Sequence, residues 1–163
     1  MKLLLNTDGG SRGNPGPAAY GFVVYDISGL PDEAAGSRNG QIGSLRETAA
    51  AQSGAGIILE KCGNYIGETT NNIAEYQGLI DGIKWEVENH PTAELEIKMD
   101  SLLIVNQVKG LFKVKNPGLF PKWQEVRGLL TKLPKWSIEH TYREGNSLAD
   151  SLVNEALDHI KRD

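Results

Sequence analysis

The stretch from Leu3 to Pro17 constrains the fold most, because its character changes sharply at Asp8. Leu3-Leu4-Leu5 is a short apolar run typical of a buried strand, and Asp8 follows closely. From Gly9 to Pro17 the chain is so rich in Gly and Pro that a loop is predicted, not a helix or a central strand. An acid at a strand end, followed by glycine backbone that a ligand can approach closely, suits a metal or phosphate site. A plain Asp-Gly turn explains the same stretch equally well.

The order of the other apolar patterns predicts an α/β fold with a mixed five-stranded sheet flanked by helices. Alternating apolar residues indicate strands at about 18–24, 56–65, 94–99 and 136–142, after the first strand. Helical spacing indicates helices at about 71–90, 101–108, 121–130 and from about 146 onward. Three consecutive strands followed by alternating helices and strands imply an antiparallel half joined to a parallel half.

Length and composition predict a single domain spanning residues 1–163, with an insertion at about 27–55. The chain has 163 residues, of which 39% are hydrophobic and 23% charged, as in ordinary globular proteins. The insertion is rich in Gly, Ala and Ser, although S-x-x-E at 44–47 predicts a short helix within it. The single cysteine, Cys62, favours a reducing compartment, and no apolar run is long enough for a signal sequence or a bilayer span. We therefore expect a cytoplasmic protein.

The net charge of −4 argues weakly against nucleic acid, but the charge distribution argues for it. Between Lys109 and Lys135 there are seven Lys or Arg residues and one acid, Glu125. Such a patch suits a polyanion, because neutralising phosphates releases counterions. A solvated helix face is the alternative explanation.

Four acids stand at the predicted ends of strands and starts of helices: Asp8, Glu75, Asp100 and Asp150. Singly, each has a structural explanation as a helix cap, as part of a capping box or as a charge favoured by the helix dipole. Together they are expected to converge, because ligands gather where parallel strands end. Converging carboxylates repel one another unless a cation joins them, and oxygen ligands without Cys or His favour Mg²⁺ or Mn²⁺. Two such ions would clamp the attacking water and the leaving oxygen of a phosphoryl displacement.

Four blocks around these acids closely resemble type 1 ribonuclease H: residues 8–17 (DGGSRGNPGP), 67–76 (GETTNNIAEY), 100–101 (DS) and 143–150 (REGNSLAD). The resemblance covers nearly the whole chain apart from 27–55, and four blocks in this order are specific. It implies a ribonuclease H-like fold, in agreement with the predicted strand order. It also implies endonucleolytic hydrolysis of the RNA strand of RNA–DNA hybrids by two Mg²⁺ ions, for which Mn²⁺ can substitute, leaving 5′-phosphate and 3′-hydroxyl ends.

The resemblance assigns a role to each matching residue. Asp8, Glu75, Asp100 and Asp150 would be the catalytic metal ligands, with Asp8 bridging both ions. Glu75 would also touch a ribose 2′-hydroxyl, the group that separates RNA from DNA locally. Substrate contacts are implied for a further set of residues: Gly9, Gly10, Asn14, Thr70, Asn71 and Asn72. For Asn71 helix capping is an equally simple role, and Asn71 or Asn72 is predicted to cap the helix. We expect a monomer that binds the hybrid, with no membrane association and no obligate protein partner.

Two features of some family members are missing from the sequence. The loop at 142–145 before the last acid has no His, and His140 falls in the predicted fifth strand, where a structural role is expected. The extra basic helix and loop that grip the hybrid are also missing, and Lys113, Lys115 and Lys122 are expected to substitute for them in part.

Two other functions remain open. One is cleavage of DNA by an enzyme of related fold, such as an integrase or junction resolvase, and the T-T-N-N-x-x-E block argues against it. The other is a non-catalytic nucleic-acid-binding module, which the presence of all four carboxylates disfavours. An oxidoreductase is not expected, because Gly9–Gly16 lacks a G-x-G-x-x-G followed by a helix.

Overall fold

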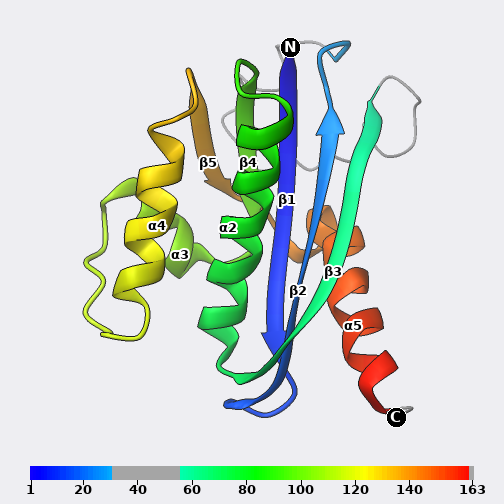
Figure 1. The fold of residues 1–163 in the computed structure, drawn as a ribbon, viewed down its shortest axis with the longest axis vertical. Helices are drawn as coiled ribbons and strands as arrows, with labels where there is room; N and C mark the ends of the chain where they lie inside the picture. Colours follow the sequence, from blue (N-terminus) through cyan, green and yellow to red (C-terminus); the bar gives the residue numbers. More distant parts are fainter. Residues whose placement is uncertain (31–55, 162–163) are drawn as a thin grey trace.

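A mixed sheet of five strands forms the centre of the protein. The computed structural model describes residues 1–30 and 56–161. Within them the strand order is β3-β2-β1-β4-β5 (Figure 1). The strands have these bounds: β1 Lys2–Ser11, β2 Gly16–Asp26, β3 Ile57–Thr69, β4 Glu94–Met99 and β5 Trp136–His140. β1 and β3 both run antiparallel to β2, whereas β1, β4 and β5 run parallel. The predicted antiparallel and parallel halves are confirmed, and they meet at β1.

The central strand β1 is longer than predicted. It continues through Gly9 and Gly10 to Ser11, which pair with residues 18–20 of β2. The expectation that a loop begins directly after Asp8 was therefore wrong. The weak strand preference of glycine is outweighed because helix α2 (Asn71–Asn89) packs directly on this part of the strand. A Cβ at Gly9 would lie 2.4 Å from the backbone nitrogen of Glu75, so only glycine allows this approach.

Two helices are capped by residues that differ from the candidates considered from the sequence. The Thr70 hydroxyl caps α2 by accepting a hydrogen bond from the backbone N–H of Ile73, so the prediction of Asn71 or Asn72 as the cap was wrong. β3 extends to Thr69, beyond its predicted end at 65, and the helix begins almost at once. Ser101 caps α3 (Leu102–Lys109), which leaves the Asp100 carboxylate without a capping role.

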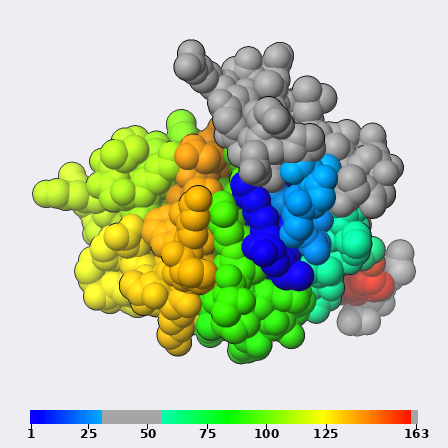
Figure 2. Space-filling model, turned by 90° about the horizontal axis from the view of Figure 1, so that it is seen from above, coloured from blue at the N-terminus to red at the C-terminus, as the bar shows by residue number. Residues whose placement is uncertain are grey.

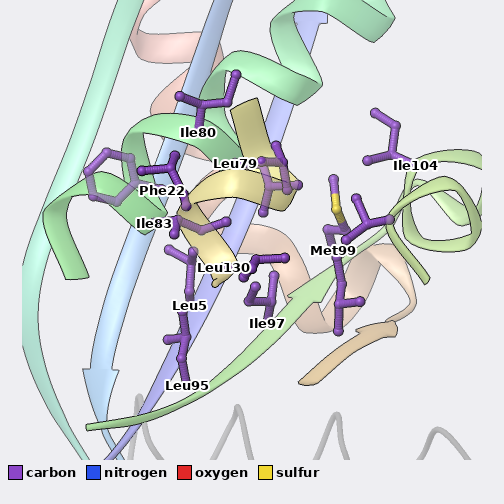
Figure 3. Packing of buried hydrophobic residues seen from close by; sticks show 14 of the residues in the cluster. Leu5, Phe22, Leu79, Ile80, Ile83, Leu95, Ile97, Met99, Ile104 and Leu130 are labelled. Atoms are coloured by element: carbon purple, nitrogen blue, oxygen red, sulfur yellow. The ribbon is translucent and has the colours of Figure 1, made fainter. Parts of the chain in front are cut away.

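Helices cover both faces of the sheet, and the alternation of side chains along β1 separates the two layers. Leu3 and Leu5 pack with α2, α3 and α4 (Phe120–Leu130) in the larger cluster, which also contains Ile97 (Figure 3). Leu4 packs on the other face, in a cluster that includes residues of α5 (Ser147–Lys161). Fully burying a Leu or Ile side chain contributes roughly 1.5–3 kcal/mol, so these clusters hold β1 firmly between two layers.

The segment expected as an insertion at 27–55 starts with residues that pack on the core. Ile27 is completely buried, and Leu30 packs against the same cluster as Leu4. Residues 31–55, with the short helix expected at 44–47, lie outside the described residues. None of the described helices is both long enough and apolar enough to cross a membrane.

Candidate active site

Three carboxylates from three different elements meet at the end of the parallel half of the sheet. Asp8 lies in β1, Glu75 near the start of α2, just past its first turn, and Asp100 directly after β4. One oxygen atom of each lies within 4.8 Å of the other two. The parallel pairing of β1 with β4 brings Asp8 and Asp100 together. Glu75 joins them because the backbone N–H of Gly9 donates a 2.8 Å hydrogen bond to its Oε1.

The fourth predicted acid, Asp150, lines the same hollow without belonging to this group of three. It lies in the first turn of α5, which follows the short 3₁₀ helix η2 (Arg143–Asn146). The buried side chain of Asn146 ties η2 to β1, because its Nδ2 donates to the carbonyl oxygen of Thr7 at 2.7 Å. Asn6 adds a hydrogen bond from its Nδ2 to the carbonyl of Gly145 at 3.1 Å. These two amides therefore determine where Asp150 lies relative to Asp8.

Burial and mutual repulsion disfavour the ionised form of these carboxylates. Burial raises the pKa of Asp8 to about 7; a hydrogen bond with Glu75 opposes this, and the charges of Asp100 and Asp150 add to it. The pKa of Glu75 lies well above its ordinary value, mainly through burial and then through Asp8. Burial also raises the pKa of Asp100, while the nearby Arg143 lowers it. Near neutral pH the protein alone therefore carries electrostatic strain at this point.

The donor atoms fit a divalent cation that prefers oxygen ligands. The three-carboxylate cluster contains neither Cys nor His. Glu75 Oε2 is buried without a hydrogen-bond partner among the described residues, an arrangement that is costly unless a cation satisfies the oxygen. Hard oxygen donors of this kind suit Mg²⁺ or Mn²⁺ better than Zn²⁺.

The hollow above the acids has a volume of about 480 Å³ and is lined partly by residues that the sequence did not single out as site residues. They include Arg12, His140, Tyr142 and Arg143. His140 lies in β5 as expected and packs edge-on against Tyr142 with ring centroids 5.7 Å apart, yet it also faces the hollow. His140 reaches the hollow because it pairs with Met99, the residue before Asp100.

Of the predicted substrate residues Asn14, Thr70 and Asn71, the two asparagines link the β1–β2 turn to the start of α2. The backbone N–H of Asn71 donates to Asn14 Oδ1 at 3.1 Å. Asn71 Oδ1 in turn accepts from the backbone N–H of Ser11 at 2.7 Å. Of the three, Asn71 lines the hollow, whereas Asn14 and Thr70 are not among the residues that line it.

Gly9, Gly10 and Asn72 also line the hollow. The two glycines differ, because a Cβ at Gly9 would collide with α2, whereas one at Gly10 would meet its nearest atom at 3.8 Å. Gly10 thus keeps the floor of the hollow open, and Gly9 has a packing role in addition to any contact with a ligand.

The basic patch expected at 109–135 is partly neutralised within the protein. Lys109 pairs with Glu139 at 2.9 Å, and Lys135 lies 3.8 Å from Glu94. Lys122 keeps its charge, because its Nζ donates to the neutral Gln77 Oε1 at 2.9 Å. Lys113 and Lys115 are exposed in the segment between α3 and α4. In Figure 2 the yellow-green part of the chain that contains this segment lies at the edge of the molecule opposite α5.

Comparison with known proteins identifies the family. The model of the family described as "Reverse transcriptase-like" matches residues 35–156. The chain is 36% identical to ribonuclease HI of Halobacterium salinarum over 151 residues, covering 93% of this chain and 62% of that protein. The structure of LC11-RNase H1 in complex with an RNA/DNA hybrid superposes with a TM-score of 0.76 at 36% identity, covering 98% of this chain and 99% of that one.

The chain belongs to the type 1 ribonuclease H family. The resemblance seen in the sequence blocks is therefore confirmed, and so is the ribonuclease H fold. The family is one of endoribonucleases. A further ribonuclease H relative is the bifunctional protein Rv2228c of Mycobacterium tuberculosis, 36% identical over 158 residues and 97% of this chain. The chain spans only 36% of the length of that protein.

Proposed function

We propose that this chain is an endonuclease that hydrolyses the RNA strand of RNA–DNA hybrids. The observation that carries the proposal is the meeting of three carboxylates in one oxygen-only cluster, with Asp150 in the same hollow. Membership of the ribonuclease H family supports the reaction class. The hybrid-bound structure of a relative with 36% identity supports the choice of substrate.

Asp8, Glu75, Asp100 and Asp150 would hold two Mg²⁺ ions, for which Mn²⁺ can substitute. Bound there, the ions would lower the pKa of a water molecule and neutralise charge that develops on the phosphate. The hydrogen bond from the Gly9 N–H fixes Glu75 so that its second oxygen faces the cluster without another partner among the described residues. Water oxygen bonds to phosphorus and the ribose 3′ oxygen leaves with a proton, which produces the 5′-phosphate and 3′-hydroxyl ends.

Selectivity for the hybrid would come from groups that recognise both strands. Glu75 would meet a ribose 2′-hydroxyl, which only the RNA strand carries. Asn14 and Asn71 use their Oδ1 atoms within the protein, so the N–H groups of each amide remain as donors for a phosphate or a base edge. Thr70, Asn72 and the backbone of Gly9–Gly10 would complete the contact surface.

Cleavage of labelled nucleic acids with and without Mg²⁺ tests this function. We expect the RNA of an RNA–DNA hybrid to be cut only with Mg²⁺, and duplex DNA and duplex RNA of the same sequence to stay intact. Equal cleavage of duplex DNA would contradict the proposed substrate and favour the DNA-cleaving alternative. Binding of the hybrid without any cleavage in Mg²⁺ would show a non-catalytic binding module.

A further inference from the structure

We propose that Arg12 is an additional phosphate-binding residue of the active site, held by Asp158 in the free protein and released to a backbone phosphate of the bound nucleic acid. The proposal rests on the proposed function, because it needs a polyanionic substrate in the hollow. It concerns two residues to which neither the sequence blocks nor the metal cluster gives a role.

Arg12 projects from a rigid base at the edge of the site. It lies in the β1–β2 turn and lines the same hollow as Asp8 and Glu75. Its backbone N–H donates to the carbonyl of Pro17 at 2.8 Å. Gly16 passes so close that a Cβ there would lie 2.2 Å from the Arg12 carbonyl oxygen, which fixes the turn beneath the side chain. The position of the Arg12 Cα is therefore set by the fold, and only its side chain has freedom to move.

The resting contact of the Arg12 guanidinium is incomplete. Nη2 donates to Asp158 Oδ1 at 2.8 Å, in an ion pair whose Asp158 side chain is 59% exposed. Exposed ion pairs of this kind add little to stability. Nη1 is buried without a hydrogen-bond partner among the described residues, so this arrangement leaves N–H groups unsatisfied. The contact with Asp158 is therefore one that the side chain can leave at small cost.

A guanidinium can donate two parallel hydrogen bonds to two phosphate oxygens, whereas the contact with Asp158 among the described residues is the single bond from Nη2 to Oδ1. The need for such a cation follows from the charges in the hollow. A nucleic acid that approaches Asp8, Glu75, Asp100 and Asp150 meets strong repulsion, and phosphates beyond the metal cluster need a cation of the protein. Arg12 lies beside α5, where it pairs with Asp158. Arg143, the other arginine that lines the hollow, interacts with Asp100 and lowers its pKa.

The proposal makes Arg12 and Asp158 energetically dependent on each other, which a double-mutant cycle measures. Binding of a fluorescent RNA–DNA hybrid would be followed by anisotropy at several salt concentrations, in the Asp100→Asn background to prevent cleavage. The proteins would carry Arg12→Ala, Asp158→Asn or both. Arg12→Lys keeps the charge but loses the paired donors, and it carries the test if the alanine variant does not fold.

Two control variants separate local contacts from general charge. Lys2→Ala removes another ion-paired cation, because Lys2 Nζ lies 3.2 Å from Glu96 Oε1, at the end of β1 opposite to the β1–β2 turn. Glu155→Gln removes an exposed acid one turn before Asp158 on the same helix. Melting curves would verify that each variant is folded.

We expect Arg12→Ala to raise the Kd about tenfold and to reduce the salt slope by about one, with Lys2→Ala changing neither appreciably. Arg12→Lys should give an intermediate Kd with an unchanged slope. Asp158→Asn should tighten binding more than Glu155→Gln does, and only when Arg12 is present. The proposal is wrong if Arg12→Ala behaves like Lys2→Ala, or if Asp158→Asn has the same effect with and without Arg12. Failure of the proposed function is distinguished separately, because wild type would then leave the hybrid uncut.

Discussion

Glu86 gives the most quantitative stability prediction, because it is a buried acid outside the active site. It lies in α2 with a fully buried side chain. Neither carboxylate oxygen has a hydrogen-bond partner among the described residues. Burial raises the pKa of Glu86 from 4.5 to about 7. The ionised form is therefore disfavoured in the folded protein and freely accessible in the unfolded chain.

The sign and size of the effect follow from this difference in pKa. An acid whose pKa is higher in the folded state lowers the free energy of unfolding only when it ionises. The loss is negligible below the unfolded pKa of 4.5 and reaches its maximum above the folded pKa of about 7. Since each pKa unit is worth about 1.4 kcal/mol, the full cost is about 3 kcal/mol. Between pH 5 and pH 8 the cost should grow by about 2.5 kcal/mol.

Replacing the acid by its uncharged amide should remove that dependence on pH. We expect Glu86→Gln to gain about 2.5 kcal/mol of unfolding free energy relative to wild type between pH 5 and pH 8. The buried amide keeps a constant desolvation cost, so the change with pH is more informative than the stability at one pH. Urea unfolding of both proteins in EDTA measures it, and Glu88→Gln, on an exposed position of the same helix, is the matched control.

Parallel pH profiles of the Glu86→Gln and wild-type proteins would refute the reasoning. They would show that Glu86 stays ionised in the fold with a partner that neutralises it. A change equal to that of Glu88→Gln would likewise assign the effect to net charge and not to burial.

Two further changes test the packing and the binding surface. Gly9→Ala should lower the melting temperature strongly, because its Cβ would lie 2.4 Å from backbone atoms of α2, whereas Gly10→Ala, with its nearest atom at 3.8 Å, should fold almost like wild type; thermal melts compare the pair. Lys113→Ala and Lys115→Ala should each weaken hybrid binding and reduce the salt slope by up to about one, as measured by salt titration. Unchanged slopes in both would show that this segment faces away from the hybrid.

Much of the fold was predictable because apolar periodicity reports directly on buried faces. The alternation of Leu95, Ile97 and Met99 indicated β4, and all three side chains are fully buried. The predicted end of this strand at Met99 also placed Asp100 directly after it. Parallel strands end at one edge of a sheet, so the approach of Asp8 and Asp100 needed no tertiary information.

The parts that the sequence did not predict depend on contacts between distant segments. Gly9 and Gly10 have the composition of a loop, but α2 packs so closely that they form part of the central strand. Asn146 was expected only as the start of the last helix, whereas its side chain donates a hydrogen bond to β1, 139 residues earlier in the chain. Arg12 and His140 line the hollow through the turn and the strand register, and local patterns carry little information about either.

Removing the single charge of Asp100 tests the proposed metal site. Burial raises its pKa, so in metal-free protein its ionised form destabilises the fold as the pH rises through that range. Ser101 caps α3, so Asp100→Asn removes the charge with little change in shape and without losing a helix cap. A cation bound by the folded protein stabilises it in proportion to its affinity, which depends on the same carboxylate.

Melting curves of wild type and Asp100→Asn in EDTA and in Mg²⁺, with cleavage of a labelled hybrid measured on the same samples, test the shared metal site most directly. We predict that Asp100→Asn melts higher than wild type in EDTA, gains less from Mg²⁺ and has almost no cleavage activity. A variant that melts lower in EDTA and still cuts the RNA strand would contradict a metal centre built on Asp100 together with Asp8 and Glu75.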